Sequence, residues 1–272
     1  MNAPSGREGR AKRAPKGINA VEIGYRVLMA VQLGPGSVAL SDVADRTGLS
    51  AGAAHNYLTS LVRTGLVERE DRGRYRLGPS AFALSRASFR LLNGYDIMRN
   101  EARALHDLTD QSVGVSVWSQ GGPISIYILR SQRAGAFTFR PGQLPLLGSG
   151  SGLLYLAYLP ASDTRELVQR ELAAVGDVRD YEDIVAAARE AVIPAGRARF
   201  SYGAPAPFSL NVPIWSNENE IPFLLSLVIH DPIDEATEAQ WLNTMRLAAD
   251  RASHLAAQSD ATGPRAFMER PG

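Results

Sequence analysis

The sequence contains no cysteine, which excludes disulfide scaffolds, thiolate zinc sites, iron–sulfur clusters and cysteine nucleophiles. It has no apolar run of the roughly 18–20 residues that a membrane-spanning helix requires. The first twenty residues are basic but lack the apolar segment of a secretory signal. Its four histidines lie far apart and show no metal-ligand spacing, so we expect no metal site. We therefore expect a cytoplasmic protein.

Recognisable catalytic motifs are also missing. The run Gly148–Gly152 lacks the glycine spacing of a nucleophile elbow, the third glycine of a dinucleotide-binding loop and the lysine of a phosphate-binding loop. Asp231, Asp234 and Glu235 precede a predicted helix, where carboxylates stabilise the positive end of the helix dipole. Because no acid–base pair or nucleophile–base set can be identified, we expect neither an enzyme nor a cofactor.

The features that are present indicate two domains with different charge. The chain has 272 residues, of which 45% are hydrophobic and 21% charged, as in a typical globular protein. Residues 1–78 hold 12 Lys and Arg against 7 acidic residues, whereas the remaining 194 hold 17 against 21. A basic N-terminal part on a mildly acidic remainder is typical of a protein in which one domain binds a polyanion.

The N-terminal part has the pattern of a winged helix-turn-helix. Residues 1–17 are expected to form a flexible basic arm, and residues 18–78 the domain itself. Helical spacing predicts a first helix with Val21, Tyr25 and Leu28 on its apolar stripe, and a second capped by Ser41. Ser50 caps a third helix, 51–64, whose predicted buried stripe is Ala54, Leu58, Leu61 and Val62. Two short strands, 66–69 and 74–77, then form a hairpin around a turn that ends at Gly73.

The rest of the chain is predicted to be an α+β domain that follows a linker helix. The linker spans 79–93, the domain 94–258, and residues 259–272 form a flexible tail. Alternating apolar residues predict strands in the middle of the domain, with helices at both ends. The predicted strands are 113–118, 124–129, 136–140, 208–215 and 223–230, and the predicted helices are 96–110, 153–159, 162–174, 180–192 and 235–257.

Polar residues on the third helix and basic residues on the hairpin are candidates for contacts with DNA. An asparagine can bond adenine through two hydrogen bonds, hydroxyl side chains reach bases or phosphates, and arginines neutralise phosphates. The candidates are Ser50, His55, Asn56, Thr59, Arg63, Arg72 and Arg74. A basic hairpin of a winged helix that binds protein instead remains an alternative.

The order of these motifs resembles the IclR family of bacterial transcriptional regulators. The similarity includes 20–33, 38–47, 49–61 and 65–78 in the helix-turn-helix, and continues through 140–152 and 210–214, so that it extends over about residues 18–256. The resemblance implies a winged helix joined to a GAF-like α/β effector-binding domain. It also implies homodimers or dimers of dimers, a palindromic double-stranded operator, and a small organic effector, often a carboxylate.

The predicted effector site combines this resemblance with the residues themselves. Gly148–Gly152 opens an apolar helix, and the amides of such a helix start suit a carboxylate or phosphate. The alternative is an ordinary capped helix start. The candidate effector-binding residues are Trp118, Phe139, Leu147, Ser149, Gly150, Ser151, Asn211 and Ser226. Because the candidates are mostly apolar, aromatic or small, we expect an aromatic or branched acid.

Two other functions remain open, and the chain departs from the family pattern in both predicted domains. Ala51 and Asn56 stand where the family usually carries a basic residue and an arginine, and Leu147 and Leu153 stand where it often carries histidine and lysine. One alternative is therefore a degenerate winged helix that acts through protein partners. The other is an enzyme with an appended winged helix.

Overall fold

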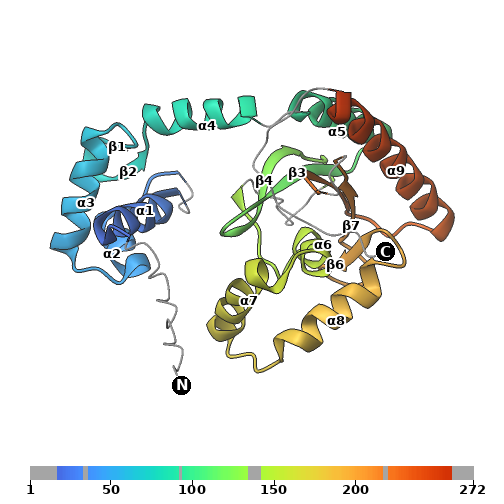
Figure 1. Ribbon diagram of the computed structural model, residues 1–272. Helices are drawn as coiled ribbons and strands as arrows, with labels where there is room; N and C mark the ends of the chain where they lie inside the picture. Colours follow the sequence, from blue (N-terminus) through green and yellow to red (C-terminus); the bar gives the residue numbers. More distant parts are fainter. Residues whose placement is uncertain (1–16, 33–35, 92–93, 134–141, 217–219, 259–272) are drawn as a thin grey trace, which may run out of the picture. The chain divides into compact units, whose positions relative to one another are not determined.

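The computed structural model describes residues 17–32, 36–91, 94–133, 142–216 and 220–258 (Figure 1). These residues fall into two compact units, one within Met1–Ser88 and the other within Phe89–Gly272. Each unit has its own hydrophobic core and is described separately. The expected boundaries of the arm, the linker and the tail stay predictions.

The first unit is a winged helix-turn-helix. Helices α1 (Asn19–Gln32), α2 (Leu40–Thr47) and α3 (Ala51–Arg63) pack around a small core that includes Val27, Val31, Val43, Ala54 and Leu58. Strands β1 (Val67–Arg69) and β2 (Tyr75–Leu77) pair antiparallel, with a single 3-10 turn (Asp71–Gly73) between them. Helix α4 (Pro79–Leu91) follows the hairpin. The three helices and the hairpin confirm the architecture expected from the sequence.

Three details of this unit differ from the predictions. Ser41 does not cap α2; Ala39 holds the cap position, and its N–H donates to Asp42 Oδ2 at 3.0 Å. Val21 and Tyr25 are 67% and 62% exposed, because none of the described residues covers this side of α1. Val62 is also exposed, whereas Ala54 and Leu58 are fully buried. Helical spacing identified the helices, but the packing of their neighbours decides which residues are covered.

The second unit is built on a six-stranded antiparallel sheet in the order β5-β4-β3-β8-β7-β6. The strands are β3 (Ser112–Ser119), β4 (Gly122–Leu129), β5 (Gly142–Gln143), β6 (Ala198–Ser201), β7 (Phe208–Ile214) and β8 (Phe223–Ile229). The helices are α5 (Tyr95–Thr109), α6 (Gly150–Tyr158), α7 (Ala161–Val175), α8 (Tyr181–Val192) and α9 (Glu235–Gln258). The α+β class is confirmed. Strands β5 and β6 were not predicted, and the predicted strand 136–140 lies outside the described residues.

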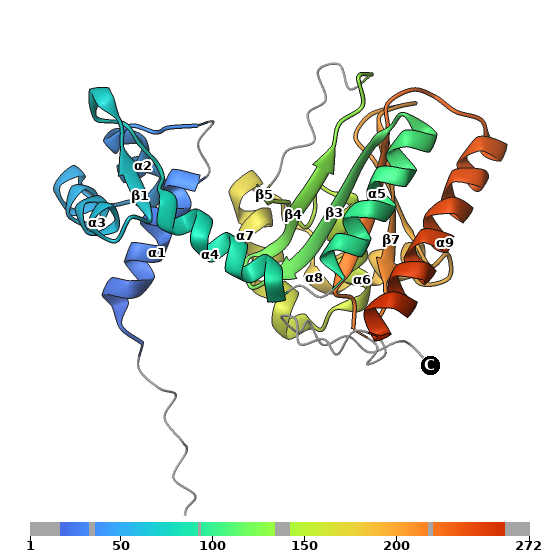
Figure 2. The ribbon, with the colours of Figure 1, turned by 90° about the horizontal axis from the view of Figure 1, so that it is seen from above.

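One face of the sheet is apolar and packs on α5 and α9, which lie side by side over it (Figure 2). We call this the apolar face; it is formed by Val113, Val115, Phe208, Leu210, Val212, Ile214, Phe223, Leu225, Leu227 and Ile229. Met98 and Leu105 of α5 and Met245 of α9 complete the cluster. Burial of these side chains supplies the main hydrophobic stabilisation of the unit.

The opposite face carries buried polar residues under α6. We call it the polar face, formed by Ser116 on β3, Ser125 on β4, Ser209 and Asn211 on β7, and Ser226 on β8, all at most 3% exposed. Because side chains alternate along a strand, each of these residues on β3, β7 and β8 lies beside a member of the apolar face, and Ser125 lies beside Ile126, which packs against the same cluster. Helices α7 and α8 pack with α6 into a separate apolar cluster.

The described helices include none that is long and apolar enough to cross a membrane. The described residues also include no group of three His, Asp or Glu side chains that could hold a metal ion.

Candidate DNA interface and effector site

The exposed side of α3 carries the polar residues expected to read DNA. His55 and Asn56 are exposed, while Ala54 and Leu58 anchor the other side of the helix in the core. Thr59 Oγ1 donates to the His55 carbonyl at 2.8 Å, so its hydroxyl can only accept from a ligand. Ser50 Oγ accepts the Ala53 N–H at 3.3 Å and acts as the N-cap of α3.

The hairpin holds its arginines in different ways. Arg74 donates to Ser37 Oγ at 3.0 Å and to the Ser37 carbonyl, which ties β2 to the segment before α2. Arg76 pairs with Glu68 at 3.3 Å and Glu70 at 3.1 Å. Arg72 lies exposed in the turn, and within the described residues it has no polar partner. The structure therefore offers Arg72, more than Arg74, to a phosphate.

The start of α6 is closely packed. Ser149 is the N-cap; its Oγ accepts the Gly152 N–H at 3.0 Å and donates to the Pro145 carbonyl at 2.6 Å. A side chain at Gly150 would collide with the Asn211 amide, so the helix approaches β7 as closely as a glycine permits. The Gly152 N–H at this helix start therefore already has a partner.

The polar face and α6 share one hydrogen-bonded network. Ser151 Oγ lies 3.2 Å from Ser116 Oγ and 3.4 Å from Ser226 Oγ. Ser226 Oγ donates to Asn211 Oδ1 at 2.7 Å, and Asn211 Nδ2 donates to Ser209 Oγ at 3.0 Å. The structure thus brings together four of the predicted effector residues, namely Gly150, Ser151, Asn211 and Ser226.

The other predicted effector residues differ in how they are connected to the helix α6. Trp118 is half-buried on β3, and its ring lies 5.0 Å from that of Tyr155 on α6. Leu147 is half-buried in the cluster of α6, α7 and α8, and its N–H donates to Glu171 Oε2 at 2.9 Å. Phe139 lies outside the described residues. The direct contacts therefore centre on α6, β3, β7 and β8.

Sequence reasoning missed Ser116, Ser125 and Tyr155. Alternation along β3, with Ser112, Gly114 and Ser116 between valines, is the signal that could have marked a polar side of this strand. Tyr155 stands one helical turn after Ser151 and therefore on the same side of α6. Burial raises the pKa of the Tyr155 hydroxyl far above its usual range, so it stays protonated.

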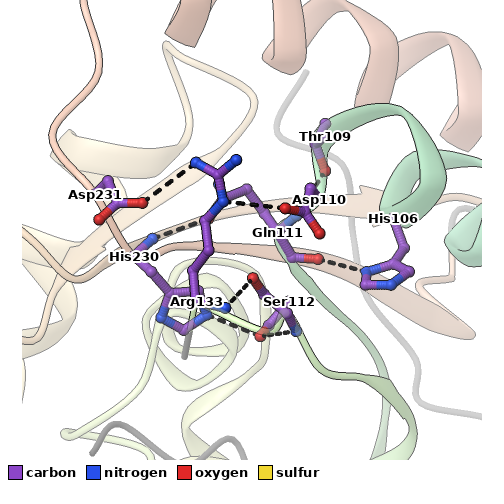
Figure 3. A network of polar contacts seen from close by, with 9 residues as sticks. His106, Thr109, Asp110, Gln111, Ser112, Arg133, His230 and Asp231 are labelled. Atoms are coloured by element: carbon purple, nitrogen blue, oxygen red, sulfur yellow. Dashed lines mark hydrogen bonds and ion pairs between the residues drawn. The ribbon is translucent and has the colours of Figure 1, made fainter. Parts of the chain in front are cut away.

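A second network joins the ends of α5, β4 and β8 (Figure 3). Arg133 bridges Asp110 at 3.0 Å and Asp231 at 3.5 Å. His230 Nε2 lies 2.8 Å from Ser112 Oγ, and the His230 N–H donates to Gln111 Oε1 at 3.0 Å.

This second network is a structural clamp. Ser112 is 1% exposed, and its Oγ also accepts the Ser131 N–H at 3.0 Å, so it is poorly placed to act as a nucleophile. Burial lowers the pKa of His230, which favours the neutral imidazole, although the charge of Asp231 opposes this shift. Asp234 accepts the Thr237 N–H at 2.7 Å and caps α9, as its place before the helix indicated.

The fold defines a class of protein: a winged helix-turn-helix followed by an α+β domain with a buried hydrogen-bonding face. The family model of the IclR helix-turn-helix domain matches residues 20–71. The chain is 26% identical to the transcriptional repressor IclR of Escherichia coli over 158 residues, which are 57% of this chain. This match spans 58% of the length of the repressor.

Solved structures share the fold over most of the chain. The IclR transcriptional regulator from Alicyclobacillus acidocaldarius is similar with a TM-score of 0.70 and 21% identity, over 89% of this chain and 100% of that one. An IclR homologue from Microbacterium hydrocarbonoxydans, complexed with 4-hydroxybenzoate, is similar with a TM-score of 0.67 and 22% identity, over 88% and 100%. The chain is therefore similar to IclR-family transcriptional regulators, in sequence over the helix-turn-helix and in fold over most of its length. Both the Escherichia coli and the Alicyclobacillus relative are transcriptional regulators.

Proposed function

We propose that the protein is a cytoplasmic, ligand-responsive regulator that binds a palindromic operator through its winged helix. His55, Asn56 and Thr59 would face the major groove, with Ser50 at the helix start, and Arg63, Arg72 and Arg74 would face phosphates or the minor groove. The exposure of His55, Asn56 and Arg72 supports this assignment.

The effector would be a small organic acid, aromatic or branched, that binds between α6 and the polar face. The observation that carries this proposal is the buried network of Ser151, Asn211 and Ser226. Burying polar side chains on this face contributes less stability than the apolar packing on the opposite face, so we attribute the polar residues to ligand binding. The complex of the Microbacterium homologue with 4-hydroxybenzoate supports an aromatic acid. The other proposed effector-binding residues are Trp118, Phe139, Leu147, Ser149 and Gly150.

The protein would act as a homodimer or a dimer of dimers, as a palindromic operator requires. Large apolar side chains left exposed on α1 and α4 support self-association: Val21 and Tyr25 on α1, and Phe82 and Leu84 on α4. The effector would change DNA affinity only if it binds the DNA-competent and DNA-incompetent arrangements with different affinity. The linker helix would transmit that difference.

Binding to the DNA directly upstream of the protein's own gene tests the DNA-binding part. We expect protected half-sites and an affinity that falls steeply with salt. Arg72→Ala should weaken binding several-fold and reduce the salt slope by about 1, as expected for one lost phosphate contact. Arg170→Ala, which removes an exposed arginine of α7, is the matched control and should bind as the wild type.

Weak binding that does not depend on sequence would contradict this function. It would favour the alternative in which the winged helix acts through a protein partner. The ion pairs that already hold Arg76 are consistent with such a hairpin.

A further inference from the structure

Two hydroxyl groups on the α6 side of the sheet are buried without a hydrogen bond. They are Tyr155 OH on α6 and Ser125 Oγ on β4, for which the described residues supply no partner. Tyr155 is 0% exposed and Ser125 is 3% exposed. A buried polar group without a partner costs free energy, so each such group in a native protein calls for an explanation.

Both groups belong to the same small region. Ser125 is paired directly with Ser116 across β3 and β4, so that their side chains lie on one face. Trp118 follows Ser116 by two residues and shares this face. On the helix, Ser151 contacts Ser116 and Tyr155 contacts Trp118. The helix therefore runs along β3 with its Ser151–Tyr155 side against the strand.

The chemistry of this region is specific. Its polar groups are neutral hydroxyls, which can donate a hydrogen bond, and its Trp118 and Tyr155 rings provide aromatic surface. No charged side chain is among the buried polar residues of the described chain. An aromatic ring bearing an sp2 oxygen, as a carboxylate or a carbonyl, matches these donors and rings.

We propose that Tyr155 and Ser125 are ligand-anchoring residues, whose hydroxyls donate to the carboxylate or carbonyl oxygen of a small aromatic molecule packed against Trp118. The inference rests on the proposed function, since it places the same effector, and it adds two residues that the motif at the start of α6 does not contain. It also explains why the hydroxyls have no partner in the ligand-free protein.

The proposal predicts opposite effects on stability and on binding. Tyr155→Phe and Ser125→Ala each remove only a hydroxyl that is unpaired in the free protein, so the melting temperature should stay the same or rise. The matched controls remove paired hydroxyls. Tyr181→Phe breaks the 2.7 Å bond to Thr164, and Ser112→Ala breaks those to Ser131 and His230, so both should lower the melting temperature by about 2 °C or more.

Thermal unfolding followed by tryptophan fluorescence measures this directly. All three tryptophans, Trp118, Trp215 and Trp241, belong to the sheet unit, so the signal reports that unit alone. A fall in melting temperature for Tyr155→Phe and Ser125→Ala that equals the fall in the controls would overturn the proposal. It would mean that water or another group already satisfies the hydroxyls.

Titration calorimetry with benzoate, 4-hydroxybenzoate and benzamide tests the ligand. The wild type should bind at least one of them, and each variant should weaken that binding about tenfold, as for a lost hydrogen bond to a ligand. Preference for benzoate over benzamide identifies a carboxylate, and the reverse identifies a carbonyl. The proposal is overturned if the wild type binds none of the three, or if the variants bind like the wild type.

These outcomes separate the inference from the function on which it rests. If the variants lose the ligand but DNA affinity never responds to it, the proposed regulation fails and the anchoring residues stand. If DNA affinity responds to an aromatic acid equally in the wild type and both variants, the regulation stands and the anchoring residues fail.

Discussion

The two faces of one sheet show how a single set of strands serves packing and binding. On β7 and β8, Leu210 and Leu227 face α5 and α9, while their neighbours Asn211 and Ser226 face α6. Both sides are almost completely buried. The apolar face gains stability from contacts, whereas the polar face uses its buried positions for hydrogen bonds that hold specific geometry. Burial alone therefore does not identify a core.

The largest effect should come from the apolar face. Leu225→Ala removes a fully buried side chain from the cluster under α5 and α9 and should lower the free energy of unfolding by about 2–5 kcal/mol. Urea unfolding followed by tryptophan fluorescence measures the loss. The control Ser116→Ala, on the polar face, should cost less than about 1 kcal/mol, because within the described residues its side chain makes a single hydrogen bond, at 3.2 Å to another hydroxyl. Equal losses would remove the distinction between the faces.

The second largest loss in the free energy of unfolding should come from disturbing the close packing of α6 on β7. Gly150→Ala places a methyl group against the Asn211 amide and should cost about 1–3 kcal/mol through overpacking. Combining it with Asn211→Ala should recover part of this loss, since the collision is removed, and a double-mutant cycle of unfolding free energies shows the coupling. Strictly additive losses would contradict the packing described here.

Removing a hydrogen bond of the polar face should lower the free energy of unfolding by a smaller amount. Ser226→Ala removes the donor to Asn211 Oδ1 at 2.7 Å and should cost about 1 kcal/mol, because the buried oxygen loses its partner. Urea unfolding followed by tryptophan fluorescence measures this loss in the free energy of unfolding. A variant as stable as the wild type would show that Asn211 finds another donor.

The smallest effect should be the pH dependence of the clamp in Figure 3. The pKa of His230 is lowered in the fold, so the unfolded chain binds more protons between the folded pKa and about 6.5. Its contribution to stability is present above pH 6.5 and is lost as the pH falls through the folded pKa. His230→Gln, which keeps a hydrogen-bonding group near Ser112, should show a weaker fall in unfolding free energy between pH 7 and pH 5. An identical pH profile would show that other groups are responsible.

The sequence could predict the order of the elements because their patterns are local. The hairpin turn at Gly73, the N-cap at Ser50 and the helix start at Ser149 are each encoded within a few residues. Asn211 and Ser226 were named as candidate effector-binding residues, and the structure brings them into contact.

What could not be predicted depends on contacts between distant segments. The exposure of Val21 depends on what packs beside α1, and the alternation on β3 does not tell which helix covers which face. Tyr155 looks in the sequence like another residue of an apolar helix. Its contact with the Trp118 ring and its unpaired buried hydroxyl mark it as different.

The measurement that tests the account most directly is the affinity for upstream DNA with and without saturating ligand, using each aromatic probe that binds the free protein. We predict that ligand changes the dissociation constant for DNA at least about fivefold, the usual lower range of allosteric coupling. We predict the same factor for the effect of DNA on ligand affinity, because the coupling is reciprocal. Identical DNA affinity with and without bound ligand would contradict the claim that the polar face controls the winged helix.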